Sequence, residues 1–432
     1  MRESVPKAPL AVGSTRWVIT LATMTAIIAL SIDMSLPAQP VLVHQLGVAD
    51  ETAQLTLSVF MIGFAVAQLF VGYLSDAWGR RRVLMIGLAL FTLAGIGCAL
   101  SPNIETLLVC RALQGIGGSA APVVARAMVR DTQPAAQAAR LLSTMLATLA
   151  IAPMVAPFIG GILLDLLDWH AIFAFLAIVG VVQLVIAHTS LVETLPADKR
   201  NVPSARGLVR TYREFFSTPS ALLPLAVMCT SFAGQFAYIA DSPFVYVEGF
   251  GMSNQAYGIY FGSTAIALML GSLTGSRMLK AGRAPRAMLV VGTAVILVGG
   301  IAVFAGTRID LGGPIDLAFG YELDLAIAGF FLPMLVYFFG VGLAGPSAGA
   351  LTLEPVPHIA GTASAALGTL QMTSGAIAGY IATKIGGSSP RVFALVAAAM
   401  AVLAALLAGS TVLLRRRQST LNSPISPPTI PS

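Results

Sequence analysis

Charged residues are scarce in this 432-residue sequence, and that scarcity sets the first limits on its fold. Asp, Glu, Lys and Arg make up 10% of the chain, whereas a soluble domain has about 25%. Hydrophobic residues make up 56%, and so few charges cannot cover that much apolar surface in water. The composition therefore excludes a nucleic-acid-binding protein, a soluble enzyme and a disordered chain.

The sequence also lacks motifs for nucleotide and metal binding. None of the four lysines follows a glycine, so the sequence has no Gly-Lys-Ser/Thr phosphate-binding loop. The three cysteines lie in apolar stretches without metal-ligand spacing, and the four histidines are scattered near span ends. We therefore expect no metal and no cofactor. Any uphill transport must then draw on an ion gradient, which we take to be the proton gradient.

Long apolar runs are what the sequence does contain. A transmembrane helix needs about 20 mostly apolar residues, and twelve runs approach or exceed this length. We predict an all-α polytopic membrane protein whose twelve transmembrane helices form two pseudo-symmetric six-helix bundles. The expected helices cover 17–40, 53–73, 83–100, 105–127, 140–163, 169–191, 221–247, 256–276, 287–306, 323–345, 360–383 and 391–414.

The polar stretches predict the domain boundaries and the topology. We expect bundles over 1–191 and 221–414, a cytoplasmic linker over 192–220 and a disordered cytoplasmic tail over 415–432. With the N-terminus in the cytoplasm, 21 of the 25 Lys and Arg residues fall in inner segments and three in outer loops. We therefore expect a multi-pass membrane protein with both termini in the cytoplasm. We also expect a monomer in the lipid bilayer, located in the bacterial inner membrane that the family resemblance described below implies.

A short motif recurs after the second helix of each half. Gly72 and Gly79 have the same spacing as Gly275 and Gly282, and an arginine follows the second glycine each time. A six-plus-six repeat is typical of transporters, in which the substrate site lies near the midplane between the halves.

The first copy of this motif places an acidic residue beside a basic cluster. Asp76 can pair with the guanidinium of Arg80 or cap a neighbouring helix. Such a pair would act as a latch that holds the halves together on one side of the membrane. We assign gating to five residues of this segment: Gly72, Asp76, Gly79, Arg80 and Arg81.

Several segments resemble a known family. Residues 72–82 resemble the loop 2–3 signature of the major facilitator superfamily, G-x-L-x-D-x-x-G-R-[RK]-x-[RK], which the chain matches at every position but the last. Arg111 and the glycine-rich residues after it resemble the helix 4 signature. A further segment resembles the helix 5 antiporter signature G-P-x-x-G-G, with an alanine in place of the first glycine; its residues are Ala156, Pro157, Gly160 and Gly161.

The segment that starts at Asp33, Asp-Met-Ser-Leu-Pro, resembles the D-M-Y-L-P element of drug:proton antiporters, and with segments around Asp241 and Gln371 it points to the bicyclomycin-resistance (Bcr/CflA) branch. The resemblance implies export of bicyclomycin, phenicols or sulfonamides in exchange for protons. Relatives usually have a small residue where this chain has Asp241.

Ionisable groups within spans are functional by default. We assign proton coupling to Asp33, with Arg111 as a nearby charge that balances it, and substrate binding to Asp33, Tyr238, Asp241 and Gln371. Asp33 and Asp241 precede a proline on the first helix of each half, so both would face a shared cavity. The alternatives are that the two carboxylates lie at headgroup level, that Arg111 pairs with a backbone carbonyl, and that Tyr238 packs against other side chains.

Two other functions fit the same helices. A proton symporter or metabolite exporter would share the fold and differ in substrate or direction. A membrane-embedded enzyme would need a nucleophile and a base paired within the spans, and no histidine lies deep in one. We therefore expect a transporter of small molecules and not an enzyme.

Overall fold

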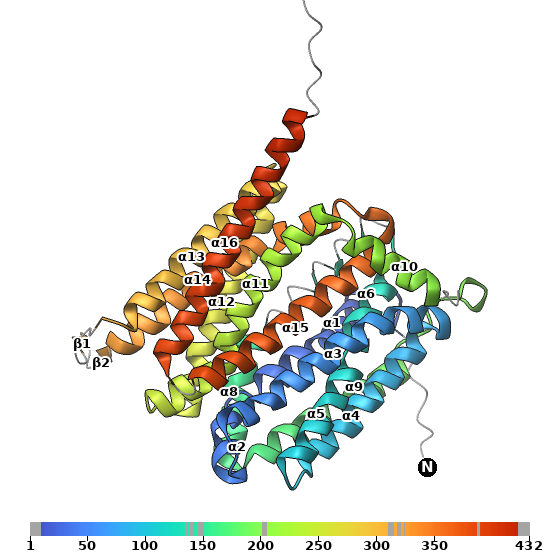
Figure 1. Ribbon diagram of the computed structural model, residues 1–432. Helices are drawn as coiled ribbons and strands as arrows, with labels where there is room; N and C mark the ends of the chain where they lie inside the picture. Colours follow the sequence, from blue (N-terminus) through green and yellow to red (C-terminus); the bar gives the residue numbers. More distant parts are fainter. Residues whose placement is uncertain are drawn as a thin grey trace, which may run out of the picture.

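The computed structural model describes residues 10–134, 137–138, 141–142, 144–145, 151–200, 205–309, 315–317, 321–323, 325–386 and 389–421. These residues are mostly helical, and Figure 1 shows the long helices packed side by side with α2, β1 and β2 at one end and α10 at the other. We refer to these two ends of the molecule as the α2 end and the α10 end.

The first half, up to residue 190, contains eight described helices. They are α1 (Thr15–Asp33), α2 (Ala38–Leu46), α3 (Asp50–Trp78), α4 (Arg80–Ala99), α5 (Ile104–Gly118), α6 (Ala120–Thr132), α8 (Ala152–Leu166) and α9 (Trp169–Ser190). The connecting segment contains a short 3₁₀ turn, η1 (Ala197–Lys199), and the amphipathic helix α10 (Ala205–Phe216).

The second half, from residue 219, repeats the pattern. Its elements are α11 (Pro219–Pro243), η2 (Phe244–Gly249), α12 (Asn254–Lys280), α13 (Pro285–Gly306), β1 (Ile315–Leu317), β2 (Tyr321–Leu323), α14 (Leu325–Leu353), η3 (Pro357–Ile359), α15 (Ala360–Gly386) and α16 (Pro390–Leu421). The strands β1 and β2 pair antiparallel, with Asp316 opposite Glu322, and the sequence did not predict this ribbon.

Ten helical segments of the described chain are long and apolar enough to cross a membrane, with α5 and α6 counted as one segment. The described part of α8 is shorter but also apolar. Helix α15, with 27 residues, packs between α3 and α11, and its Gly, Ser and Thr content makes it less apolar. The predicted all-helical polytopic class is confirmed, and the ten spans with α8 and α15 agree with the predicted twelve helices.

Several boundaries differ from prediction, and two of them have a clear physical reason. The span expected over 17–40 is interrupted between α1 and α2, because Pro37 removes a backbone donor and disfavours helix before it. Helix α16 continues to Leu421, past the expected end at 414, since its Arg and Gln residues are good helix formers. The span expected over 140–163 falls partly outside the described residues, as do residues 422–432 of the expected tail.

The repeated glycine motif has the same backbone geometry in both halves. Gly79, between α3 and α4, has a φ of 98°, and Gly282, between α12 and α13, has a φ of 84°. Only glycine adopts this left-handed region at little cost. The second glycine of each copy therefore reverses the chain at the α10 end, which explains the spacing found in the sequence.

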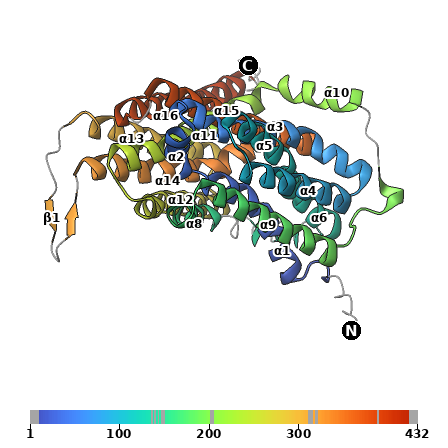
Figure 2. The same cartoon turned by 90° about the horizontal axis from the view of Figure 1, so that it is seen from below.

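The two halves meet along two seams and at the α2 end. Helix α3 packs against α15, and α8 packs against α12; Figure 1 shows the first pair and Figure 2 the second. At the α2 end, α2 contacts η2, where His44 Nε2 lies 3.3 Å from Glu248 Oε1. These contacts close the molecule at the α2 end.

Candidate functional site

Arg111 is buried in the first half and holds three helices together. Its guanidinium donates to the hydroxyl and the carbonyl oxygen of Ser31 on α1, at 3.0 and 3.2 Å. It also donates to the Thr56 carbonyl on α3 at 3.2 Å and to Gln114 Oε1 at 2.8 Å. The guanidinium carbon lies 4.4 Å from the centre of the Phe60 ring, a cation–π distance. The alternative interpretation, in which Arg111 pairs with backbone carbonyls, describes these contacts.

Asp33 lies near this network but does not join it. It ends α1 and is only 5% exposed. Each residue of a helix rotates the side-chain direction by about 100°. Asp33 follows Ser31 by two residues, so its side chain points almost opposite to that of Ser31, which Arg111 binds. No hydrogen bond or ion pair joins Arg111 to Asp33 in this structure, so the expectation that Arg111 balances the Asp33 charge stays a prediction. Within the described residues, the Asp33 carboxylate has no hydrogen bond and no ion pair.

The surroundings of Asp33 come from both halves. Gly160 of α8 packs so closely on the last turn of α1 that a Cβ there would collide with the Met34 carbonyl. Ile32 and Leu36, at the end of α1, belong to the same buried apolar cluster as Tyr257 of α12. The Tyr257 hydroxyl lies 2.9 Å from Ser242 Oγ on α11. Asp33 therefore sits where the second half closes over the end of α1.

Asp241 occupies the equivalent place on α11, but its environment differs. The Thr383 hydroxyl of α15 donates to the Asp241 carboxylate, which is 1% exposed. The side chain is therefore enclosed by protein in this conformation and does not line an open cavity. The prediction that Asp241 binds substrate is thus not supported by its position.

Tyr238 packs inside the second half. Its ring is fully buried and packs against aromatic rings of the second half, including Phe338 at 5.2 Å and Phe393 at 5.8 Å between centroids. Its hydroxyl donates to the Tyr246 hydroxyl at 3.3 Å. In this conformation Tyr238 packs as the alternative interpretation describes, and its contact with substrate stays a prediction. Both faces of α11 are apolar, so the sequence could not show which one faced the core.

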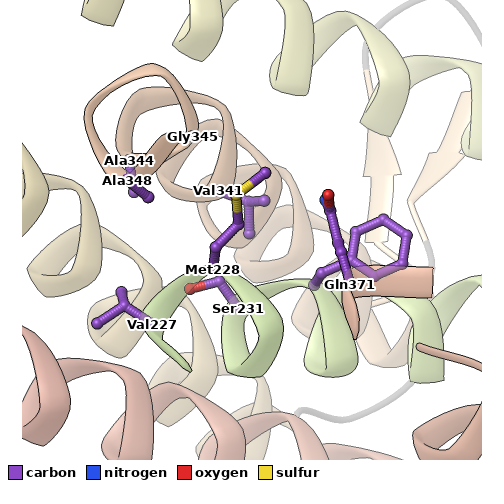
Figure 3. Close-up of a pocket in the computed structure, with 9 residues that line it drawn as sticks. Val227, Met228, Ser231, Val341, Ala344, Gly345, Ala348 and Gln371 are labelled. Carbon is purple, nitrogen blue, oxygen red and sulfur yellow. The ribbon is translucent and has the colours of Figure 1, made fainter. Parts of the chain in front are cut away.

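A small pocket lies in the second half, on the α10 side of the closed contacts. Seven of its nine lining residues are apolar, and Ser231 and Gln371 are polar but uncharged. Figure 3 shows the α11 side chains facing α14, with Gln371 of α15 at one edge. Among the described residues, the buried Ser231 hydroxyl has no hydrogen-bond partner. Gln371 is the one predicted substrate residue that lines this pocket.

The predicted gating residues gather at the α10 end. Asp76 pairs with Arg80, and Arg80 Nε also donates to Asp131 Oδ2 on α6 at 2.7 Å. Arg81 donates to the His188 carbonyl at 2.6 Å. All these partners belong to the first half, and no hydrogen bond or ion pair joins Asp76 to the described residues of the second half. The expected latch between the halves is therefore not formed in this conformation.

Glu193 is a member of this cluster that the sequence analysis missed. Its carboxylate accepts the backbone N–H groups of Arg80 at 2.9 Å and Arg81 at 3.2 Å, so it caps the first turn of α4. The Glu193 carboxylate also lies close against Gly79, whose positive φ already favours glycine. By contrast, Gly72 has room for a Cβ near Val123.

The antiporter-like segment forms the seam between α8 and α12. Ala156 and Pro157 are fully buried or nearly so, and Gly161 lies against the Asn254 backbone. From the other side, Gly258 lies against Phe158. The small residues therefore allow close helix packing, as the stripe predicted.

Comparison with known proteins identifies this arrangement. The family model described as Major Facilitator Superfamily matches residues 21–379. The chain belongs to this superfamily. It is therefore a multi-span membrane transporter of small molecules and not an enzyme, as the sequence predicted.

Relatives and solved structures agree with this placement. The chain is 35% identical to an uncharacterized MFS-type transporter, YdgK, of Bacillus subtilis, over 83% of this chain and 86% of that protein. It is 26% identical to a bicyclomycin resistance protein homolog of Haemophilus influenzae, over 87% and 92%. It is 28% identical to the multidrug resistance protein MdtL of Escherichia fergusonii, over 86% and 89%.

A solved peptide transporter, POT, in complex with sulfate, superposes with a TM-score of 0.72 at 15% identity, over 97% of this chain and 98% of that one. A D-xylose-proton symporter superposes with a TM-score of 0.70 at 17% identity, over 91% and 97%. These two similarities show the fold alone.

Proposed function

We propose that this transporter exports small uncharged amphipathic compounds, of the bicyclomycin, phenicol or sulfonamide type, in exchange for protons across the bacterial inner membrane. The observation that carries the proposal is Asp33, a buried carboxylate without a partner among the described residues at the junction of the two halves. Such a group is costly in a membrane unless it is used. Relatives named for bicyclomycin and multidrug resistance support the substrate class.

The geometry supports a specific role for Asp33. The closed contacts lie at the α2 end and the pocket lies on the α10 side, so we assign this conformation to the state open toward the cytoplasm, with both termini there. Separation of α8 from α12 would draw Tyr257 of α12 away from the end of α1, while Gly160 keeps α8 packed on that end. Asp33 would then take up a proton from outside and release it after the halves close again.

The pocket supports an uncharged substrate. Its lining has no ionisable side chain, and the Ser231 hydroxyl and the Gln371 amide supply the only side-chain hydrogen-bonding groups. A cation or anion would lose its hydration there without a counter-charge, which is costly. Arg111 keeps a positioning role in this scheme, because it fixes the end of α1 without contacting Asp33.

The proton gradient supplies enough energy for this exchange. One charge moved through 100 mV is worth about 2.3 kcal/mol. At about 1.4 kcal/mol per tenfold concentration ratio, one net proton sustains a drug gradient of roughly 10- to 100-fold.

A susceptibility panel in an efflux-deficient bacterium tests the substrate class. We expect the protein to raise resistance to at least one neutral compound among bicyclomycin, phenicols and sulfonamides, and not to cationic dyes. Ser231→Ala and Gln371→Ala should reduce that resistance. Ser263→Ala, whose hydroxyl bonds only its own helix at the Ile259 carbonyl, is the matched control. Accumulation of the compound in cells would favour the symport alternative and overturn export.

A further inference from the structure

Helix α10 has one face docked on the transmembrane helices. Phe215 is fully buried on this face. The Tyr212 hydroxyl donates to the Leu69 carbonyl of α3 at 3.3 Å, and Thr362 of α15 donates to Thr211 at 3.4 Å. Burial raises the pKa of Tyr212 to about 12, so this donor keeps its proton at physiological pH. Helix α10 is therefore held against the seam between α3 and α15.

The opposite face of α10 is basic and apolar. Arg206, Arg210 and Arg213 are all exposed, and their spacing of four and three residues places them in one stripe. Val209 and Phe216 lie along one edge of the stripe, with 66% and 47% of their surfaces exposed. Three cations beside two apolar side chains are typical of a helix that lies in a membrane interface.

The positive charge of this face is not neutralised within the protein. Among the described residues, none of the three arginines has an ion pair. Glu214 lies on the same helix, but its carboxylate pairs with His358 at 2.5 Å. The stripe is therefore free to bind an external anion.

The depth of α10 indicates where that anion lies. Leu69 is nine residues before the end of α3 at Trp78, which corresponds to about 13 Å along the helix axis. On this part of α3, Val66 and Phe70 are half exposed, as expected for a lipid-facing surface. Helix α10 thus contacts the side of α3 through Tyr212, near the end of the bundle where Figure 1 shows it.

We propose that the exposed face of α10 binds anionic phospholipid headgroups of the adjacent leaflet. The guanidinium groups of Arg206, Arg210 and Arg213 pair with lipid phosphates, for which their planar donors are suited. Val209 and Phe216 enter the boundary between headgroups and acyl chains. A soluble acidic protein would satisfy the arginines but would leave these two side chains without an apolar environment.

Lipid-selective quenching tests this interface in the intact transporter. A bimane label is attached to Val209→Cys in a chain whose other three cysteines are alanine. The protein is reconstituted in vesicles of phosphatidylcholine and phosphatidylglycerol at about 3:1, with bromine on the chains of one lipid only. We expect brominated phosphatidylglycerol to quench several-fold more per molecule than brominated phosphatidylcholine. Salt at about 1 M, where the Debye length is about 3 Å, should reduce this ratio toward one.

Two triple variants complete the test. R206Q, R210Q and R213Q together should remove the preference for phosphatidylglycerol. R277Q, K280Q and R283Q together remove the same charge from exposed positions around the α12–α13 turn and should leave it unchanged. Equal quenching by both lipids at low salt would overturn charge recognition. Absence of quenching by either lipid would place the face in water and overturn the membrane contact. The salt series tests charge recognition in the protein that keeps all three arginines, so the test does not depend on whether the arginine variants fold.

Discussion

Arg111 binds Ser31 through both the hydroxyl and the carbonyl oxygen of that one residue. The carbonyl belongs to the last turn of α1, two residues before Asp33. A buried arginine therefore fixes the helix that presents the carboxylate, while leaving the carboxylate itself unpaired among the described residues. Because Arg111 holds α1 in place without pairing with Asp33, the two residues should have separate roles, and the first two predictions test them.

Asp33→Asn should abolish proton-coupled export. Asparagine has nearly the same shape but cannot release a proton, so the variant should insert normally and still bind drug. Drug-induced proton release from everted vesicles should fall by at least about tenfold, which corresponds to about 1.4 kcal/mol of lost coupling. If the Asn variant still releases protons when drug is added, the coupling group lies elsewhere, and Asp241 is the next candidate.

Arg111→Lys should impair transport without changing its pH dependence. Lysine keeps the charge but cannot donate to Ser31, Thr56 and Gln114 together. Each lost bond to a buried charge costs about 1.5–3 kcal/mol, so the melting temperature should also fall. Arg283→Lys, at an exposed turn, serves as control. A shifted pH profile of the residual exchange would show that Arg111 takes part in proton coupling directly.

Asp76→Asn should lower transport several-fold with normal insertion. Its pair with Arg80 is half exposed, and Arg80 keeps the less exposed Asp131. Because an exposed pair is worth about 0–1 kcal/mol, we expect little effect on stability. Asp131→Asn should reduce stability more than Asp76→Asn does. Glu105→Gln, at the other end of the bundle, should change neither transport nor stability. Wild-type transport by the Asp76 variant would exclude a gating role for this residue.

Asp241→Asn should leave the export of a neutral substrate nearly unchanged. Asparagine retains an oxygen that can accept the Thr383 hydroxyl, and the side chain does not line the pocket. A phenicol export assay, with Asp33→Asn as the inactive reference, measures the effect. A severe loss of phenicol export with normal membrane insertion would mean that Asp241 contacts substrate in another conformation.

The sequence predicted the helices and the motif residues well because these depend on local patterns. Apolar runs of span length, the repeated Gly79 and Gly282 and the small residues of α8 each impose their structure nearly independently of the rest. Glu193 could have been found in the same way, since it follows a span and lies among arginines at the basic end.

The sequence was less informative about which side chains contact one another within the bundle. The pairing of Arg111 with Ser31 depends on the rotation of α1 about its axis. Because α1 is apolar on all sides, its sequence does not show which face points toward lipid and which toward the other helices. The same ambiguity placed Tyr238 in the cavity. Whether Asp76 crosses between the halves depends on the conformation, which the sequence does not specify.

The two seams between the halves resist sliding differently. Along α3 and α15, Ser58 donates to the Ala376 carbonyl at 2.9 Å and Thr369 donates to the Ala65 carbonyl at 2.9 Å. Displacement there must exchange these bonds in discrete steps. Along α8 and α12, Gly258 and Gly262 bring backbone against backbone. Side-chain hydrogen bonds join these two helices at the α2 end, where the Asp165 carboxylate accepts from the amide groups of Asn254, at 2.7 Å, and Gln255. The first seam is therefore fastened by hydroxyl groups within the length of α3, and the second by one carboxylate near the end of α8, so the two seams would release at different levels of the transporter.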